Sequence, residues 1–470
     1  MPRTNSLTEA RPACLTRTIA VSCDLLALHA RNPHRYPFLA ESAASGTPQA
    51  RYDILFAFPG ETLALSPQGT LSGPMSDHGG NFLDAFNGWW EELRLPRESA
   101  RGLPPFRGGW FVYAGYELAG EIEPSLRLPA APGSLPVAYA CRIPAAVIRD
   151  RKEKSLILVA EAAQAELLDV MAGDVNDAIK AGEAWLEYAH DPCLEGELEE
   201  EDPAIYLDGV ARVIDYVLAG DVFQVNLSRA WSGKLKPGVS DDALYDRLRK
   251  RNPAPFAGLA KIGRHTILST SPERLVEVRE RTVQTRPIAG TRPRGTSGLT
   301  DVALSEELIA HPKERAEHIM LVDLERNDLS RVCVPGSVKV SENMVIESYA
   351  QVHHIVSNIR GQLYDGVAPG DVIRAIFPGG TITGCPKVRC MEIIAELERV
   401  GRGPYTGSMG YVNRDGGMDL NILIRTIVRD GDWIYLRAGA GIVADSIPER
   451  ELEETRAKAG AILMALVTET

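Results

Sequence analysis

Residues 422–446, ILIRTIVRDGDWIYLRAGAGIVADS, carry the clearest signal for the fold. The apolar stretches 422–428 and 433–438 have the length and the β-branched or aromatic content of strands, and only a short polar stretch separates them. No helical pattern lies between them, and strand and helix patterns do not alternate as β-α-β units elsewhere in the chain. The sequence therefore predicts an α+β protein with mainly antiparallel sheets, not a doubly wound fold.

Outward from this segment, the same patterns predict the other elements. Further strands are expected at 52–57, 110–114, 145–148, 156–160, 223–229, 266–269 and 409–412. Helices are expected at 165–188, 205–219, 316–324, 372–376, 388–397 and 449–467. Gly220 suits the C-cap of the second of these helices.

The chain also shows one break in composition. Residues 193–203, CLEGELEEEDP, are acidic, poor in β-branched residues and closed by a proline. With 470 residues, 44% of them hydrophobic, the chain is long enough for two domains. We expect an N-terminal domain over 1–194 and a second domain over 203–470, although an acidic helix end inside one domain would give the same pattern.

Charge and composition exclude several classes of protein. The formal net charge is −12 and the cationic side chains are spread out, which argues against a nucleic-acid surface but permits a small anionic ligand. No membrane-spanning apolar run and no secretory signal is found, so a cytoplasmic protein without membrane contact is expected. The seven cysteines are scattered without a CxxC pair, which predicts reduced thiols.

Four glutamates are candidates for a metal site. Glu314 and Glu317 form one pair, Glu451 and Glu454 another, each three residues apart on a predicted helix. This spacing puts both members of a pair on one helical face. Two such faces across a cleft would offer hard oxygen ligands to Mg²⁺, although the same spacing is common on solvated helices.

Three glycine-rich segments lie at 287–295, 377–387 and 438–446. Glycine lets backbone N–H groups converge on a carboxylate or phosphate. None of the segments fits a P-loop or a dinucleotide fingerprint, and tight turns between strands are the alternative interpretation.

Three single residues add chemistry to this picture. His354 follows His353 in an apolar strand pattern, so only one of the two rings can face a cleft, and a buried structural histidine is the alternative. Glu273 would be a general acid if burial raised its pKa, and otherwise an ion-pairing glutamate. Arg425 is the only charge in an apolar strand pattern, which calls for a carboxylate partner. Together these residues indicate an enzyme that acts on a small polycarboxylate.

Eight segments from about residue 206 to the C-terminus resemble, in order, the chorismate-binding enzymes, which include the synthases of anthranilate, aminodeoxychorismate, isochorismate and salicylate. They are FQVNLSRA (223–230), SPER (271–274), TRPIAGTRPRG (285–295), AEHIMLVDLERNDLSRV (316–332), VHHIVS (352–357), FPGGTITGCPKVRCMEII (377–394), YTGSMGY (405–411) and AGAGIVADS (438–446). The resemblance implies two antiparallel sheets packed as a sandwich with helices outside.

The resemblance also assigns roles to residues. It implies Mg²⁺ between Glu317 and Glu454 with Glu314 and Glu451 close by, Glu273 as general acid or base at the 4-hydroxyl of chorismate, and His354 assisting across the ring. Lys458 would add positive charge. The residues implied to bind the substrate are Gly290, Thr291, Thr383, Tyr405, Arg425, Gly439, Ala440 and Gly441.

Two positions separate the members of this family. Relatives that use water carry an activating lysine where this chain has Gln224, and glutamine is no base, so ammonia is the expected nucleophile. Many aminodeoxychorismate synthases carry a lysine where this chain has Ala289, which favours anthranilate synthase component I. Asn226, Thr383 and the segments 36–42, 51–59 and 252–258 look more like the aminodeoxychorismate enzymes. The expected product is therefore 4-amino-4-deoxychorismate, with anthranilate as the alternative.

The resemblance also bears on partners. The chain has no glutaminase signature, so a separate glutamine amidotransferase subunit is expected to supply ammonia in a heterodimer. A catalytically silent regulatory subunit is disfavoured because the four glutamates and His354 are all present. In relatives the N-terminal domain can hold tryptophan, and Glu41 and Ser42 are the residues here that could serve such a ligand.

Overall fold

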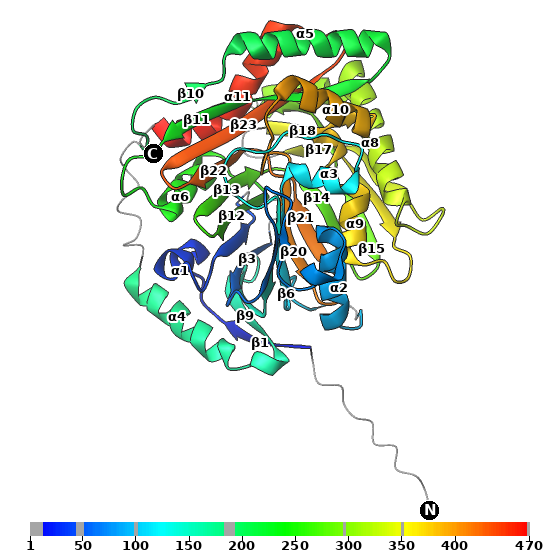
Figure 1. The fold of residues 1–470 in the computed structure, drawn as a ribbon. Coiled ribbons are helices and arrows are strands. Elements are labelled where there is room, and N and C mark those ends of the chain that lie inside the picture. The colour runs from blue at the N-terminus through cyan, green and yellow to red at the C-terminus, as the bar shows by residue number, and fades with distance from the viewer. Residues whose placement is uncertain are drawn as a thin grey trace, which may run out of the picture.

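Two large sheets stacked face to face, with helices outside, form the protein (Figure 1). This computed structural model describes residues 13–43, 51–97, 102–182, 193–294, 298–348 and 352–467. Every strand pair recorded among these residues is antiparallel. The predicted α+β class is confirmed.

The first sheet contains the predicted strands 422–428 and 433–438. Its order is β1 (Cys14–Ile19), β9 (Ser155–Glu161), β8 (Ala145–Asp150), β3 (Tyr52–Ala57), β2 (Phe38–Glu41), β12 (Phe256–Ile262), β13 (His265–Ser271), β22 (Thr426–Asp430), β23 (Trp433–Ile442), β11 (Gln224–Lys234) and β10 (Glu199–Glu200), with β19 (Gly384–Cys385) also paired to β11.

The second sheet has the order β16 (Ile288–Pro293), β18 (Val352–Gln362), β15 (Thr282–Thr285), β14 (Arg274–Arg279), β21 (Met418–Asn421), β20 (Ser408–Asn413), β6 (Gly109–Ala114), β7 (Ala138–Ile143), β4 (Thr62–Leu65) and β5 (Leu71–Ser72). β17 (Lys339–Ser348) pairs with β18.

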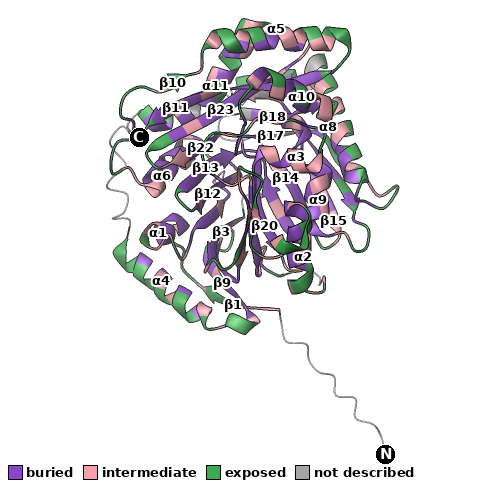
Figure 2. Cartoon of the chain, in the orientation of Figure 1, coloured by how far each residue is buried: buried purple, intermediate pink, exposed green. Residues whose placement is uncertain are grey.

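Helices cover the outer faces, and many residues on their outward sides are exposed (Figure 2). They are α1 (Leu25–Arg31), α2 (Phe82–Leu93), α3 (Ala119–Ile122), α4 (Leu167–Ala181), α5 (Pro203–Ala219), α6 (Asp241–Arg251), α7 (Gly298–Ala310), α8 (Pro312–Ser330), α9 (Pro369–Ile376), α10 (Lys387–Glu398) and α11 (Pro448–Val467). Short 3-10 turns lie at Ser76–His78, Tyr116–Leu118, Ala162–Gln164 and Gly380–Ile382.

Aromatic side chains fill the space between the two sheets. Phe38 and Phe56 of the first sheet meet Phe111 and Tyr411 of the second, and the rings of Phe38 and Phe111 stack with centroids 4.0 Å apart. Stacked sheets bury one face of every strand in such a layer. This shared core makes the two sheets a sandwich, as expected.

Both sheets combine strands from the two ends of the chain. β2 pairs with β12, and β6 pairs with β20. The predicted boundary near 194–203 therefore divides the sequence but not the sheets, and it stays a prediction. The acidic stretch there contributes β10, a β-bridge from Leu194 to Leu235 and the loop that leads to α5.

Three predicted elements differ from the structure. The helix expected over 165–188 is α4, which ends at Ala181, and residues 183–188 lie outside the described residues. The strand expected over 422–428 begins only at Thr426, because Arg425 has a φ of 52° and interrupts it. Residues 288–293, expected in a glycine-rich turn, form strand β16. By contrast, α5 ends before Gly220 in a left-handed cap, as expected.

A buried carboxyl group predicts how stability depends on pH. Glu325 of α8 accepts a hydrogen bond from Thr285, and burial raises its pKa to about 8. The pKa of Glu325 in the folded protein lies above the value of about 4.3 for a glutamate in the unfolded chain. The bound proton therefore contributes fully to the free energy of unfolding below about pH 4.3, and this contribution is lost as the pH rises through about 8. We expect Glu325→Gln to remove part of this loss, up to about 1.4 kcal/mol per pH unit, in urea unfolding followed between pH 5 and 8. Equal slopes for both proteins would contradict it.

Candidate active site

Glu273 occupies the turn between β13 and β14 and is buried. Burial raises its pKa to about 7, while a hydrogen bond from Thr381 Oγ1 at 2.7 Å and the charge of Arg425 act in the opposite direction. Near neutral pH a substantial fraction of this carboxyl group is therefore protonated. A buried carboxylic acid of this kind can give a proton to a leaving group and take one back afterwards.

Arg425 lies at the break between β21 and β22. Its backbone φ of 52° puts a residue with a bulky side chain in the left-handed region, where strain is expected. Burial lowers the pKa of its guanidinium and Glu273 opposes that shift, while Nη1 donates to Asn252 Oδ1 at 3.4 Å. The expectation that Arg425 lies within a strand was therefore wrong, although its charge does act on a carboxyl group.

His354 lies in β18 opposite Thr291 of β16. Burial, followed by the charge of Arg425, lowers the pKa of its ring to about 4, while a hydrogen bond with the Gly290 backbone acts the other way. The ring is therefore neutral at pH 7. The neighbouring His353 contacts Ser348 and Asp301 instead, as the alternation of a strand requires.

Gly290 forms a bulge in β16, where the pairing register with β18 shifts between Ala289 and Thr291. Its φ is 67°, and a Cβ atom at this position would come within 2.8 Å of Glu314 Oε2. A glycine is thus needed both for the backbone and for the carboxyl group beside it. Ala289 is buried, and the side chain of Thr291 lies outside the described residues.

The amide of Gln224 connects Glu317 to the glycines of β23. Gln224 Nε2 donates to Glu317 Oε1 at 2.7 Å, and a Cβ atom at Gly441 would collide with the same nitrogen. Gln224 Oε1 is buried without a hydrogen-bond partner in the described part of the chain. Such an atom is expected where a polar ligand binds.

Tyr405 and Lys458 meet at Gly439. A Cβ atom at Gly439 would lie 2.8 Å from Tyr405 Oη and 2.9 Å from Asn226 Oδ1. Lys458 Nζ donates to Gly439 O at 3.0 Å and pairs with Glu454 at 2.8 Å. The residue between the glycines, Ala440, is fully buried on the apolar side of the strand.

Thr383 lies next to Asn226, on the side of that residue away from Lys458 and Gly439. It is fully buried, its hydroxyl donates to Gly379 O at 2.9 Å, and its carbonyl accepts from Asn226 N at 2.9 Å. Thr383 and Asn226 are thus bonded to each other, and Asn226 Oδ1 is also buried without a partner among the described residues.

The four glutamates can be tested as a Mg²⁺ site. Among the described residues, no three His, Cys, Asp or Glu side chains form a cluster that would hold a metal unaided. Glu317 is linked through Gln224 to Gly441 of β23. Glu454 is linked through Lys458 to Gly439 of the same strand. These two positions are two residues apart, about 7 Å along a strand. Mg²⁺ needs only one or two carboxylates and takes waters and an anionic substrate for the rest of its shell. The residues present fit such an ion.

The other two glutamates lie one helical turn away from these. Glu314 accepts from Arg292 Nη1 at 3.2 Å and sits beside Gly290, while Glu451 lies in the first turn of α11. Both Glu451 and Glu454 raise the pKa of buried Tyr206 through their charge, although desolvation is the larger cause. Glu451 and Glu454 therefore both lie close enough to Tyr206 for their charges to act on it.

Sequence patterns did not single out three residues that matter here. Thr381 holds Glu273, Asn252 holds Arg425, and Arg402 lies under Tyr405. Thr381 and Asn252 do lie within the segments 377–387 and 252–258 that carry the resemblance. Nothing in the local pattern marked Arg402.

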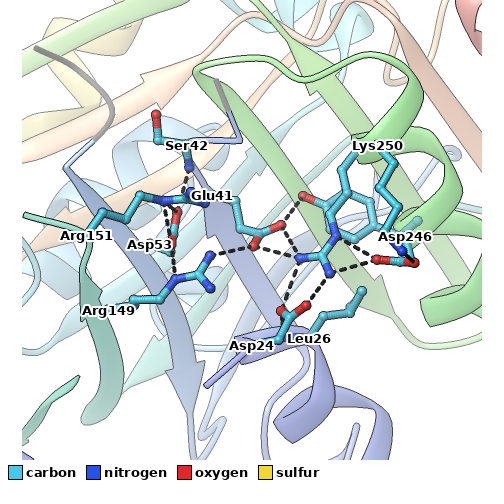
Figure 3. Close-up of polar contacts among 11 residues, drawn as sticks. Asp24, Leu26, Glu41, Ser42, Asp53, Arg149, Arg151, Asp246 and Lys250 are labelled. Carbon is cyan, nitrogen blue, oxygen red and sulfur yellow. Dashed lines mark hydrogen bonds and ion pairs between the residues drawn. The ribbon is translucent and has the colours of Figure 1, made fainter. Parts of the chain in front are cut away.

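Glu41 and Ser42 belong to a separate, buried ionic network (Figure 3). Glu41 accepts from Arg249 at 2.9 Å and from Tyr245 at 3.0 Å, and Ser42 N donates to Asp53 Oδ1 at 2.8 Å. A cavity of about 740 Å³ between the sheets adjoins both residues.

A buried carboxyl group with a raised pKa beside a buried guanidinium is typical of an enzyme active site. Residues 61–464 match the sequence model of the chorismate binding enzyme family, and the chain belongs to that family. Within the described residues, no helix is long and apolar enough to span a membrane.

Among its relatives are two proteins with different products. The chain is 40% identical to anthranilate synthase component 1 of Thermus thermophilus over 386 residues, 82% of each chain. It is also 40% identical to aminodeoxychorismate synthase component 1 of Bacillus subtilis over 399 residues, again 82% of each. The crystal structure of anthranilate synthase component I from Streptococcus pneumoniae superposes with a TM-score of 0.77 at 31% identity and covers 89% of this chain and 93% of its own.

Proposed function

We propose that this protein aminates chorismate with ammonia and that its product is 4-amino-4-deoxychorismate. The observation that carries amination is the hydrogen bond from Gln224 to Glu317, which puts a neutral amide where a water-activating base would be needed. A carboxamide does not accept a proton at neutral pH, so a nucleophile that needs no deprotonation, such as ammonia, is favoured.

The site residues divide into three groups in this reaction. Glu317 and Glu454, with Glu314 and Glu451, would hold Mg²⁺, which would supply charge neutralisation and electron withdrawal at the ring carboxylate. Arg425, Tyr405 and the Gly439 backbone bind the enolpyruvyl carboxylate. Lys458 adds positive charge beside them, and Gly290 leaves room for the ring carboxylate.

Glu273 carries the proton transfers. Its carboxyl group gives a proton to the 4-hydroxyl as the C–O bond breaks, and water leaves. Ammonia then forms the new C–N bond and loses one proton, which the Glu273 carboxylate accepts. The neutral ring of His354 assists from across the substrate.

The sequence resemblance of Asn226 and Thr383 to the aminodeoxychorismate enzymes supports 4-amino-4-deoxychorismate as the product. Asn226 Oδ1 lies beside Gly439 and Tyr405, on the side of the site where the enolpyruvyl carboxylate is proposed to bind.

Ala289 favours the second candidate, anthranilate, formed by amination at C2 with loss of pyruvate. Its buried methyl group cannot form the adduct that a lysine makes in many aminodeoxychorismate synthases. If the product is 4-amino-4-deoxychorismate, ammonia acts without that adduct.

The ammonia source that we propose is a separate glutamine amidotransferase subunit. Both curated relatives carry the designation component 1, which implies a second component. Free ammonium at high concentration should replace that subunit in an assay.

The test is product analysis by mass spectrometry after incubation with chorismate, Mg²⁺ and ammonium at mildly alkaline pH. We expect 4-amino-4-deoxychorismate, which retains the enolpyruvyl group. Anthranilate with free pyruvate would instead establish the second candidate, and no aminated product would overturn the proposal.

The variant Gln224→Lys gives a further prediction for the same assay. This substitution removes the hydrogen bond that the Gln224 side-chain amide donates to Glu317. It also introduces an amine, which in its neutral form can take a proton from water. We expect amination to fall by up to about 100-fold, the cost of a misplacement of about 1 Å in an active site. Attack by water in place of ammonia should give an isomer of chorismate with the hydroxyl group at another ring carbon. This isomer has the mass of chorismate and is separated from it by chromatography. Unchanged amination would contradict the role given to Gln224.

A further inference from the structure

Arg402 is a fully buried arginine whose guanidinium lies against the ring of Tyr405, one of the residues of the candidate site. It lies in the loop from α10 to β20, and its side chain is 1% exposed. A guanidinium in a protein interior is tolerated only when its donors and its charge are satisfied. The partners of Arg402 therefore define what it holds in place.

Its charge is met by Glu398, at the end of α10. Arg402 Nη2 donates to Glu398 Oε1 at 2.6 Å and Nε donates to Oε2 at 3.0 Å, in a two-pronged contact. Arg437 Nη2 adds a third bond to this carboxylate at 3.0 Å. Burial by itself would raise the pKa of Glu398, but Arg402 and Arg437 hold it below its ordinary value. The carboxylate therefore stays ionised, with two guanidinium groups around it.

The guanidinium of Arg402 also contacts three segments that line the site, two through hydrogen bonds and one through an aromatic ring. Nη2 donates to Asn226 O of β11 at 2.7 Å, and Nη1 donates to Ile382 O of the Gly380–Ile382 turn at 3.1 Å. The first segment begins with Gln224, and the second contains Thr381, which holds Glu273. The guanidinium also lies 5.5 Å from the centroid of the Tyr405 ring, within range of a cation–π interaction.

We propose that Arg402 is a positioning residue for this site, in which its planar fork keeps β11, the Gly380–Ile382 turn and Tyr405 in one arrangement. The proposal rests on chorismate being the substrate. The fork shape matters because a lysine ammonium carries the same charge but cannot contact Glu398, Asn226 and Ile382 in fixed directions. Arg402 would act through Tyr405 and the two backbone segments, without touching the substrate.

The test compares Arg402→Lys with Arg249→Lys. Arg249 is a largely buried arginine that pairs with Asp24, Glu41 and Asp246, none of which is a residue of the candidate site, so its variant controls for loss of a buried fork. Binding of chorismate is measured by titration calorimetry with Mg²⁺ and without ammonia, so that no turnover occurs. We expect the Kd for chorismate to rise by about 10-fold in Arg402→Lys, as for a misplaced binding group. We expect no change in Arg249→Lys.

With ammonium added, the KM of Arg402→Lys should rise more than kcat falls. An unchanged Kd in Arg402→Lys, or the same change in both variants, would overturn the proposal. If Arg402→Lys does not fold, Ser228→Ala takes its place, because it removes one hydroxyl bond to Glu398 and one partner of Arg437. It should raise Kd by about 2- to 5-fold, as expected for loss of about one hydrogen bond, and an unchanged Kd would again overturn the proposal. Wild type that binds chorismate but makes no amine would refute the proposed function and leave this test intact.

Discussion

Replacing Glu273 by glutamine should lower the rate of product formation from chorismate by about 100- to 10,000-fold, the range expected for loss of a general acid. Glutamine keeps the shape and the bond from Thr381 but carries no transferable proton. Because the pKa of Glu273 is about 7, the wild-type rate at a fixed concentration of free NH3 should fall as the pH rises above that value. The variant should lose this limb of the profile. Stopped assays of chorismate loss between pH 6 and 9 measure both effects.

A matched control for this variant is Glu277→Gln in β14. Glu277 is also buried, but it pairs with Arg279 at 2.7 Å and does not line the site. It should keep the rate and the pH profile of the wild type even if its melting temperature falls. An alkaline limb that persists in Glu273→Gln would assign the titration to another group.

The second large effect concerns Mg²⁺. Chelation should abolish product formation, and added Mg²⁺ should restore it. Loss of a group that only supports a metal ligand costs about 10- to 100-fold, so loss of a ligand should cost more. We therefore expect Glu317→Gln and Glu454→Gln each to lower activity at fixed Mg²⁺ by about 100-fold or more, with partial recovery at higher Mg²⁺.

The neighbouring Glu453 provides the control for the metal variants. It lies on the exposed side of α11 and pairs with Arg456, so Glu453→Gln removes one negative charge from the same helix without touching the site. Its Mg²⁺ dependence should match that of the wild type. If all three variants behave alike, the effect is one of net charge, not of ligation.

Most of the fold could be predicted because long periodic segments dominate it. β3 and α5 appear where their patterns put them, and the pairing of β22 with β23 follows from the two apolar stretches near residue 430. The strand limit at Arg425 could not be predicted. An apolar run does not reveal a residue whose backbone is held in the left-handed region by tertiary contacts.

The candidate site was predictable to a similar degree. The glycines were recognised from composition, but Gly290 acts as a bulge and Gly439 and Gly441 as strand residues, not as turns. Which side chains meet them depends on the registry of distant strands and helices, and single-sequence patterns do not contain this information. The buried network of Arg402 and Glu398 escaped for the same reason, since neither residue lies in an apolar periodic segment.

The composite sheets constrain how the chain can fold during synthesis. β6 leaves the ribosome long before β20, yet Ala114 pairs with Ser408. Until β20 arrives, the nascent chain exposes an unpaired edge and the apolar face around Phe111. Such an intermediate is prone to aggregate and is a natural client for chaperones. Premature termination anywhere before β20 should therefore give insoluble fragments and not a folded N-terminal half.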